Sequence, residues 1–265
     1  MTTPLSISYT SDITKDQASA FAKKHNYACV NISEVTTPLN LNYSDNYVEL
    51  RDTEKNISIH IDFISGDLAH RQQYGGGRGQ SIAKAIGLKQ GTPPPSVLDA
   101  TAGLAKDAFV LACLGCSMTL LERSPVIVEL INDAIERASE NENFKSILEK
   151  GFKVINQSSI DYLTNLPESD DVIDHDVIYP DVIYLDPMYP DRKKSASVKK
   201  NMQILQKLLG KDEDTQELLN AALDVAKKRV VVKRPKGAEN LSELKPTYTV
   251  ESKKTRYDVY ITKTE

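Results

Sequence analysis

The chain has 265 residues, of which 40% are hydrophobic and 26% are charged, with three cysteines and a formal net charge of −4. This composition is typical of a globular protein of one or two domains, and it contains no apolar run of the roughly 18 residues that a membrane span needs. Three cysteines argue against a disulfide framework, and the first 14 residues lack the features of a secretory signal peptide. We therefore expect a cytoplasmic protein.

Residues 1–65 are predicted to form a small α+β domain. Residues 14–25 have the spacing of an amphipathic helix, and residues 57–63 alternate between apolar and polar, as a half-buried strand does. Residues 47–50 are the expected partner strand. The polar stretch 36–45 is expected to be a connection between the earlier and later elements.

Residues 66–95 are predicted to link two domains. The three successive glycines at 75–77 favour neither helix nor strand, so they predict a loop, and residues 81–86 return to helical spacing. Prolines at 93–95 fix an extended connection, which predicts a domain boundary.

From residue 96 onwards, short apolar strands alternate with amphipathic helices. This order predicts an α/β domain over 96–265 with a Rossmann-like, doubly wound and mostly parallel sheet. The expected helices are 106–114, 125–150, 198–209 and 217–226. The expected strands are 97–99, 117–121, 152–156, 182–185, 229–233, 248–252 and 257–261.

The end of the first strand of this domain suits a ligand with an amino-acid end. Ligands of such sheets bind beyond the carboxyl ends of the strands, and small residues around Gly103 allow a close backbone approach. The pattern lacks G-x-G-x-x-G, so a dinucleotide is disfavoured. Asp99 and Asp107 would meet an ammonium group of the ligand, and Lys106 would meet its carboxylate.

The next two strand ends suit a nucleoside. Glu122 would accept hydrogen bonds from ribose hydroxyls, and Arg123 would stack on adenine. Ser158 and Ser159 would bond the adenine edges. Together with the first strand end, these residues predict S-adenosylmethionine (SAM) as the cofactor.

The fourth strand leads into Asp186-Pro187-Met188-Tyr189-Pro190, which suits a base amine. The carboxylate of Asp186 and the carbonyl of Pro187 would accept both N–H bonds, so that the nitrogen lone pair faces a methyl donor. Tyr189 would stack on the base. Asp186, Pro187 and Tyr189 are therefore the predicted catalytic residues, and Asp186 also borders the cofactor. We expect catalysis to depend mainly on the positioning and desolvation of the reacting groups, without a metal.

Basic residues near these strand ends are candidates for contacts with RNA phosphates, because local charge matters more than its sum. They are Arg71, Arg78, Arg192, Lys193, Lys194, Lys199, Lys200, Lys233 and Arg234.

Residues 99–104, 121–125 and 184–190 resemble the bacterial ribosomal RNA small subunit methyltransferase J family, and the similarity extends over roughly 66–261. The resemblance implies a class I methyltransferase sheet and SAM-dependent methylation of the exocyclic N2 of one guanine in 16S rRNA. It implies cofactor contacts at 106–107, 122–123, 158–159 and 186, with 16S rRNA or the small ribosomal subunit as partner. Lys106 replaces an arginine of the family.

Alternative functions are an amino-group methyltransferase on adenine N6 of nucleic acid or on a protein amide, a non-catalytic RNA-binding or ribosome-assembly module, and a nicotinamide-dependent oxidoreductase. Met188 replaces the second proline of the (Asn/Asp)-Pro-Pro-aromatic signature, which favours guanine over adenine. Cys113 and Cys116 form a single C-x-x-C pair, which we interpret as structural rather than zinc-binding. No membrane or metal partner is expected, and a monomer is favoured.

Overall fold

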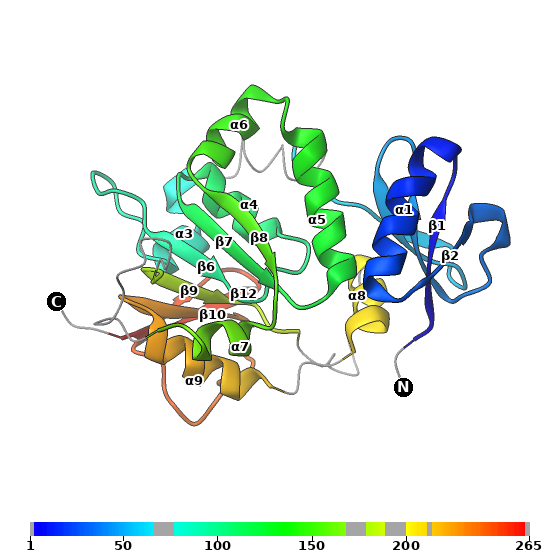
Figure 1. The fold of residues 1–265 in the computed structure, drawn as a ribbon. Coiled ribbons are helices and arrows are strands. Elements are labelled where there is room, and N and C mark those ends of the chain that lie inside the picture. The colour runs from blue at the N-terminus through cyan, green and yellow to red at the C-terminus, as the bar shows by residue number, and fades with distance from the viewer. Residues whose placement is uncertain (1–2, 66–76, 168–178, 189–199, 211–213, 263–265) are drawn as a thin grey trace. The chain divides into compact units, whose positions relative to one another are not determined.

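The structure is a computed structural model that describes residues 3–65, 77–167, 179–188, 200–210 and 214–262 (Figure 1). The chain divides into two compact units. The first comprises residues 1–62, 124–138 and 188–212, and the second comprises residues 63–123, 139–187 and 213–265. The first unit thus differs from the continuous segment 1–65, because two helices from later in the chain pack with its sheet.

The first unit contains a five-stranded sheet in the order β2-β1-β3-β4-β5. Strand β1 is parallel to β2 and β3, and β4 is antiparallel to β3 and β5. The strands are β1 (Leu5–Tyr9), β2 (Ala28–Asn31), β3 (Leu39–Tyr43), β4 (Val48–Asp52) and β5 (Ile57–Ile59). The helices are α1 (Asp12–His25), the 3-10 turn η1 (Ile32–Glu34), α5 (Pro125–Ala138) and α8 (Lys200–Leu209).

The expectation of a polar connection over 36–45 is wrong, because this stretch contains the central strand β3. All five residues of β3 are buried. The hydroxyl of Ser8 on β1 lies 3.0 Å from Oδ1 of Asn40 and 2.9 Å from Oδ1 of Asn42. Buried polar side chains are tolerated when a neighbouring strand supplies hydrogen-bond partners. The strand expected over 57–63 also ends early, at Ile59.

The second unit contains a seven-stranded sheet in the order β11-β12-β10-β9-β6-β7-β8. All neighbours are parallel except β12, which is antiparallel to β10 and β11. The strands are β6 (Ser96–Asp99), β7 (Ser117–Glu122), β8 (Phe152–Asn156), β9 (Val182–Leu185), β10 (Arg229–Pro235), β11 (Tyr248–Glu251) and β12 (Thr255–Ile261). The predicted Rossmann-like fold is therefore confirmed, with a strand at each of the seven expected places.

Five helices and one 3-10 turn are described in this unit. They are η2 (Gly77–Gly79), α3 (Ser81–Ala85), α4 (Lys106–Cys113), α6 (Glu142–Glu149), α7 (Ser159–Thr164) and α9 (Thr215–Val225). The single helix expected over 125–150 is two helices, α5 and α6. The break occurs because the side chain of Asn141 accepts hydrogen bonds from the backbone of Asn143 and Phe144, which begins a new helix.

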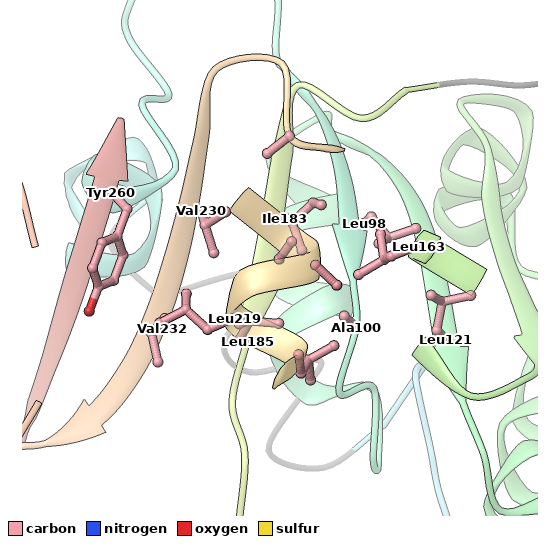
Figure 2. Close-up of a cluster of buried hydrophobic side chains, with 14 residues drawn as sticks. Leu98, Ala100, Leu121, Leu163, Ile183, Leu185, Leu219, Val230, Val232 and Tyr260 are labelled. Atoms are coloured by element: carbon pink, nitrogen blue, oxygen red, sulfur yellow. The ribbon is translucent and has the colours of Figure 1, made fainter. Parts of the chain in front are cut away.

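Helices cover both faces of the seven-stranded sheet. On one face, Leu219 of α9 and Leu163 of α7 belong to the same buried cluster as Ile183 and Val230 of the strands (Figure 2). On the other face, Phe109 of α4 and Phe144 of α6 stack at a centroid distance of 6.1 Å. Burial of each such side chain stabilises the fold by roughly 1.5–3 kcal/mol. The sheet is thus held between two apolar layers.

The strand order reverses between β6 and β9, since β7 and β8 follow on one side and β10 on the other. In an open α/β sheet, a ligand binds outside the carboxyl ends of the strands at such a switch point. In the part of the chain that the structure describes, no helix combines the length and apolarity that a bilayer span requires.

Candidate active site

A tight turn follows β6 at the switch point. Asp99 ends the strand and is only 2% exposed. Its Oδ1 accepts a hydrogen bond from the backbone N–H of Thr101 at 3.0 Å. Gly103 and Ala105 then adopt left-handed backbone conformations, with φ of +49° and +55°. Such conformations are natural for glycine but strained for alanine, so the turn is tightly determined before α4 begins.

Glu122 connects the end of β7 to this turn. Its side chain is buried, and Oε2 accepts a hydrogen bond from the N–H of Gly103 at 3.1 Å. The two neighbouring strands therefore present carboxyl groups at one edge of the sheet, separated by a small-residue turn. The structure thus brings together Asp99, Gly103 and Glu122, as the sequence predicts.

A lysine connects two further carboxylates of the site. The register of β9 and β10 places Val232 beside Leu185, so Lys233 follows next to Asp186. The Nζ atom of Lys233 lies 2.7 Å from Oδ2 of Asp186 and 2.7 Å from Oδ2 of Asp107. The hydroxyl of Tyr184 donates to the same oxygen of Asp107 at 2.7 Å.

The backbone at Asp186 is fixed as well. The N–H of Asp186 donates to the hydroxyl oxygen of Thr101 at 2.6 Å, which ties the end of β9 to the turn after β6. The Pro187 that follows is buried. A single turn residue, Thr101, thereby bonds both Asp99 and Asp186.

The charges of these groups are strongly coupled. Burial raises the pKa of Asp99 to about 7, and the carboxylates of Asp107 and Asp186 contribute to the shift. Burial alone would lower the pKa of Lys233, but Asp186 and Asp107 offset this effect, and its pKa lies above the usual value. With Lys233 protonated, three carboxyl groups share one ammonium group, so the site favours a cationic ligand.

The remaining predicted cofactor residues lie around this edge. Ser158 caps α7, and its hydroxyl oxygen accepts the N–H of Asp161 at 3.4 Å. The hydroxyl of Ser159 donates to the carbonyl of Ala100 at 2.6 Å. Lys106 is exposed at the first residue of α4. The guanidinium of Arg123 lies 3.0 Å from Oδ2 of Asp214, ahead of α9.

Two of the predicted RNA-binding residues are placed differently from the expectation. Lys233 is engaged by the two carboxylates described above. Arg234 is only 4% exposed, and its guanidinium donates to the carbonyl of Glu239. Lys233 and Arg234 are adjacent in β10, so their side chains point to opposite faces of the sheet. Carboxylates bind Lys233 on one face, and a carbonyl binds Arg234 on the other. Both cations therefore already have partners within the protein.

The other predicted residues fall into two groups. Arg78 is exposed, and its Nη1 donates to the carbonyl of Lys89 at 2.6 Å. Lys200 is the first residue of α8. Outside the described residues lie Arg71, Tyr189, Arg192, Lys193, Lys194 and Lys199.

Beside Lys236, a basic residue expected at the rim of the site after β10, the structure places a hairpin with two further lysines. Strands β10 and β11 both run antiparallel to β12, so β11 ends at the same edge as β10. The turn after β11 carries Lys253 and Lys254, both exposed. The N–H of Lys236 donates to the carbonyl of Lys254 at 3.0 Å, which fixes the hairpin to the end of β10. We refer to Lys236, Lys253 and Lys254 as the lysine hairpin.

A metal has no evident site in the described part of the chain, where no group of three or more His, Cys, Asp or Glu side chains is arranged to hold one. Burial raises the pKa of Cys113 and of Cys116 to about 12. Both thiols are therefore protonated and poorly reactive near neutral pH.

The arrangement fits a ligand that carries an ammonium group and a ribose. The buried carboxyl of Asp99 and the anionic balance of the cluster suit a cation. The carboxylate of Glu122, held by the turn at Gly103, suits a diol at the next strand end. Because Gly103 has no side chain, the backbone of this turn can approach such a ligand closely.

Comparison with known proteins agrees with this chemistry. Residues 24–262 match the model of a family described as "Putative SAM-dependent methyltransferase". A solved SAM-dependent methyltransferase from Neisseria gonorrhoeae superposes with a TM-score of 0.71 at 31% sequence identity, over 97% of this chain and 96% of that one.

Two curated relatives define the family more narrowly. "Ribosomal RNA small subunit methyltransferase J" of Shewanella loihica is 48% identical over 83% of this chain and 81% of its own length. The protein of the same name from Aeromonas salmonicida is 48% identical over 81% of this chain and 82% of its own. The chain therefore belongs to the ribosomal RNA small subunit methyltransferase J family of SAM-dependent methyltransferases.

Proposed function

We propose that this methyltransferase transfers the methyl group of SAM to the exocyclic N2 of a guanine in 16S rRNA, in the cytoplasm. The observation that carries the proposal is the position of Asp186. It lies at the end of β9, next to the turn after β6, and is fixed there by Thr101 and Lys233. A carboxylate held in this way can orient an amine towards a methyl donor bound at the turn.

The cofactor is SAM, which supplies a methyl group on a positively charged sulfur. We assign its ammonium group to Asp99 and Asp107, and its ribose hydroxyls to Glu122. We assign its carboxylate to Lys106, and its adenine to Arg123, Ser158 and Ser159. The hydroxyl of Ser159 already donates to Ala100, so its oxygen would serve as an acceptor.

The base amine needs help, because its lone pair is delocalised into the ring. The carboxylate of Asp186 and the carbonyl of Pro187 accept its two N–H bonds, which directs the lone pair at the methyl group. The N–C bond forms as the S–C bond breaks, and the nitrogen then loses a proton to the carboxylate or to water. We assign stacking on the base to Tyr189. Preorganised acceptors of this kind account for most of the expected rate acceleration.

The RNA backbone would be held beyond the strand ends. Lys236 follows Lys233 by three residues, which places it about 10 Å further along the chain at the usual strand rise. The lysine hairpin therefore lies within reach of phosphates that flank a base at Asp186. Arg78 and Lys200 remain candidates for further contacts, as do Arg71, Arg192, Lys193, Lys194 and Lys199.

The direct test is to locate the methyl group. The purified protein is incubated with labelled SAM and, separately, with 16S rRNA, small ribosomal subunits and DNA, and the nucleosides are separated by mass spectrometry. We expect N2-methylguanosine from rRNA. N6-methyladenosine as the product would overturn the proposed acceptor. Binding of SAM and RNA without any product would favour a non-catalytic module.

A further inference from the structure

Lys233 follows three buried valines in β10. The three residues before it, Val230, Val231 and Val232, are fully buried. The side chain of Lys233 is 28% exposed. A lysine in such a place is costly unless its charge is matched, so its partners indicate what it does.

The ammonium group bridges two elements that arise far apart in the sequence. It lies 2.7 Å from a carboxylate oxygen of Asp107 on α4, and 2.7 Å from one of Asp186 after β9. The hydroxyl of Tyr184 occupies the same oxygen of Asp107, which keeps that carboxylate in place. Lys233 thus contacts the residue that we assign to the base amine and a residue that we assign to the cofactor.

Without this ammonium group, like charges would crowd the site. Asp186 faces Lys233 on β10, Asp107 on α4, Asp99 on β6 and Tyr184 on its own strand. Lys233 is the cation among these groups. Burial raises the pKa of Asp186, Lys233 opposes this shift, and Asp107 adds to it. Removing the lysine would favour the protonated acid, because neighbouring carboxylates repel.

Protonation of Asp186 would change its chemistry. An ionised carboxylate accepts hydrogen bonds only, whereas a carboxylic acid also donates one. A donor facing the base amine would compete for the lone pair that must attack the methyl group. The same change would release Asp186 from Lys233 and loosen its orientation.

We propose that Lys233 is a positioning residue for methyl transfer, which holds the Asp186 carboxylate ionised and oriented towards the substrate amine. This role rests on the function proposed above. Lys233 acts through Asp186 and does not itself touch the reacting atoms.

The test compares Lys233→Met, Lys233→Gln and Lys233→Arg with the wild type in the full chain. Single-turnover methylation of RNA at saturating SAM is measured from pH 6 to pH 9. We expect a nearly level profile for the wild type. For Lys233→Met and Lys233→Gln we expect a loss of roughly tenfold or more at pH 7 that shrinks as the pH rises, since one pKa unit corresponds to tenfold. Lys233→Arg should restore the level profile.

The matched control is Lys228→Met. Lys228 also links β10 to the β9 side of the sheet, through Asp181 at 3.2 Å, but at the opposite edge. It should leave the pH profile unchanged. Thermal denaturation and calorimetric SAM binding establish whether each variant is folded. If Lys233→Met does not fold, the comparison is made with Lys233→Gln.

A loss that is equal at every pH and is not restored by arginine would show a merely structural role and overturn the proposal. The proposed function is tested separately, by identifying the nucleoside that the wild-type protein methylates. The pH comparison can be made on whichever amine is methylated, so failure of one conclusion is distinguishable from failure of the other.

Discussion

The N–H of Gly103 donates to Oε2 of Glu122 at 3.1 Å, and this bond joins the first turn of the sheet to the end of its second strand. Glu122 is therefore more than a surface carboxylate at a strand end. It supports the turn after β6, and in the proposed complex its carboxylate would also bind the ribose. Separating these two roles requires a variant that preserves the bond to Gly103.

Glu122→Gln is that variant, because the amide oxygen can still accept the N–H of Gly103. Loss of the charge should weaken SAM binding by about tenfold, and Glu122→Ala by about a hundredfold, since hydrogen bonds to charged groups contribute roughly 1.5–3 kcal/mol. Titration calorimetry measures both. Glu149→Gln, at an exposed residue of α6, is the control. Unchanged affinity in Glu122→Gln would contradict the ribose assignment.

Asp186→Asn should separate chemistry from binding. The amide keeps one acceptor but cannot carry the negative charge, so we expect the rate of methyl transfer to fall by about 10²–10³-fold, as for other preorganised electrostatic groups. RNA affinity, measured by filter binding, should persist. The control is Asp224→Asn, at an exposed residue of α9. Full activity in Asp186→Asn would refute the proposed role of the carboxylate.

Asp99 makes the stability of the ligand-free protein depend on pH. Its folded-state pKa is about 7, raised above the ordinary value of 3.8 chiefly by burial. The folded state therefore holds a proton that the unfolded state has lost, and stability decreases as the pH rises from about 4 to 7. The full decrease is at most about 4 kcal/mol.

Asp99→Asn should remove this dependence while keeping the acceptor for Thr101. We expect it to raise the melting temperature at pH 8 much more than at pH 4, as measured by thermal denaturation without SAM. It should also weaken SAM binding, because the carboxylate is lost. An equal shift at both pH values would mean that Asp99 is not protonated in the folded protein.

The lysine hairpin should contribute to RNA affinity through charge alone. Lys253→Ala with Lys254→Ala is expected to weaken RNA binding and to reduce the slope of log affinity against log salt by about 1.4, which is roughly 0.7 for each phosphate contact on a single strand. Lys145→Ala with Lys150→Ala is the control at α6. An unchanged slope would exclude these lysines from the RNA-binding surface.

Much of the second unit could be predicted from the sequence, because strands such as β7 and β9 are short, mainly apolar runs that alternate with amphipathic helices. Each motif is a short continuous segment at the end of a predicted strand, so Asp99, Glu122 and Asp186 could be identified as parts of one site. The polar residues of β3 could not, since Asn40 and Asn42 are buried with hydrogen-bond partners that the neighbouring strands supply, among them Ser8 of β1.

The partners of Lys233 could not be predicted either. In the sequence it stands in a basic run, which suggests a solvated, phosphate-binding residue. Its actual environment depends on the sheet order, which places β10 beside β9, and on α4 returning to the same edge. The lysine hairpin depends in the same way on a backbone bond between Lys236 and Lys254.

The bridge at Lys233 also has a consequence for synthesis. Its partners Asp186 and Asp107 precede it by 47 and 126 residues. A nascent chain that has already formed β6, β7 and β9 therefore still lacks the ammonium group that matches these carboxylates. The carboxylates of Asp107 and Asp186 therefore acquire this partner only after β10 has been synthesised and has paired with β9.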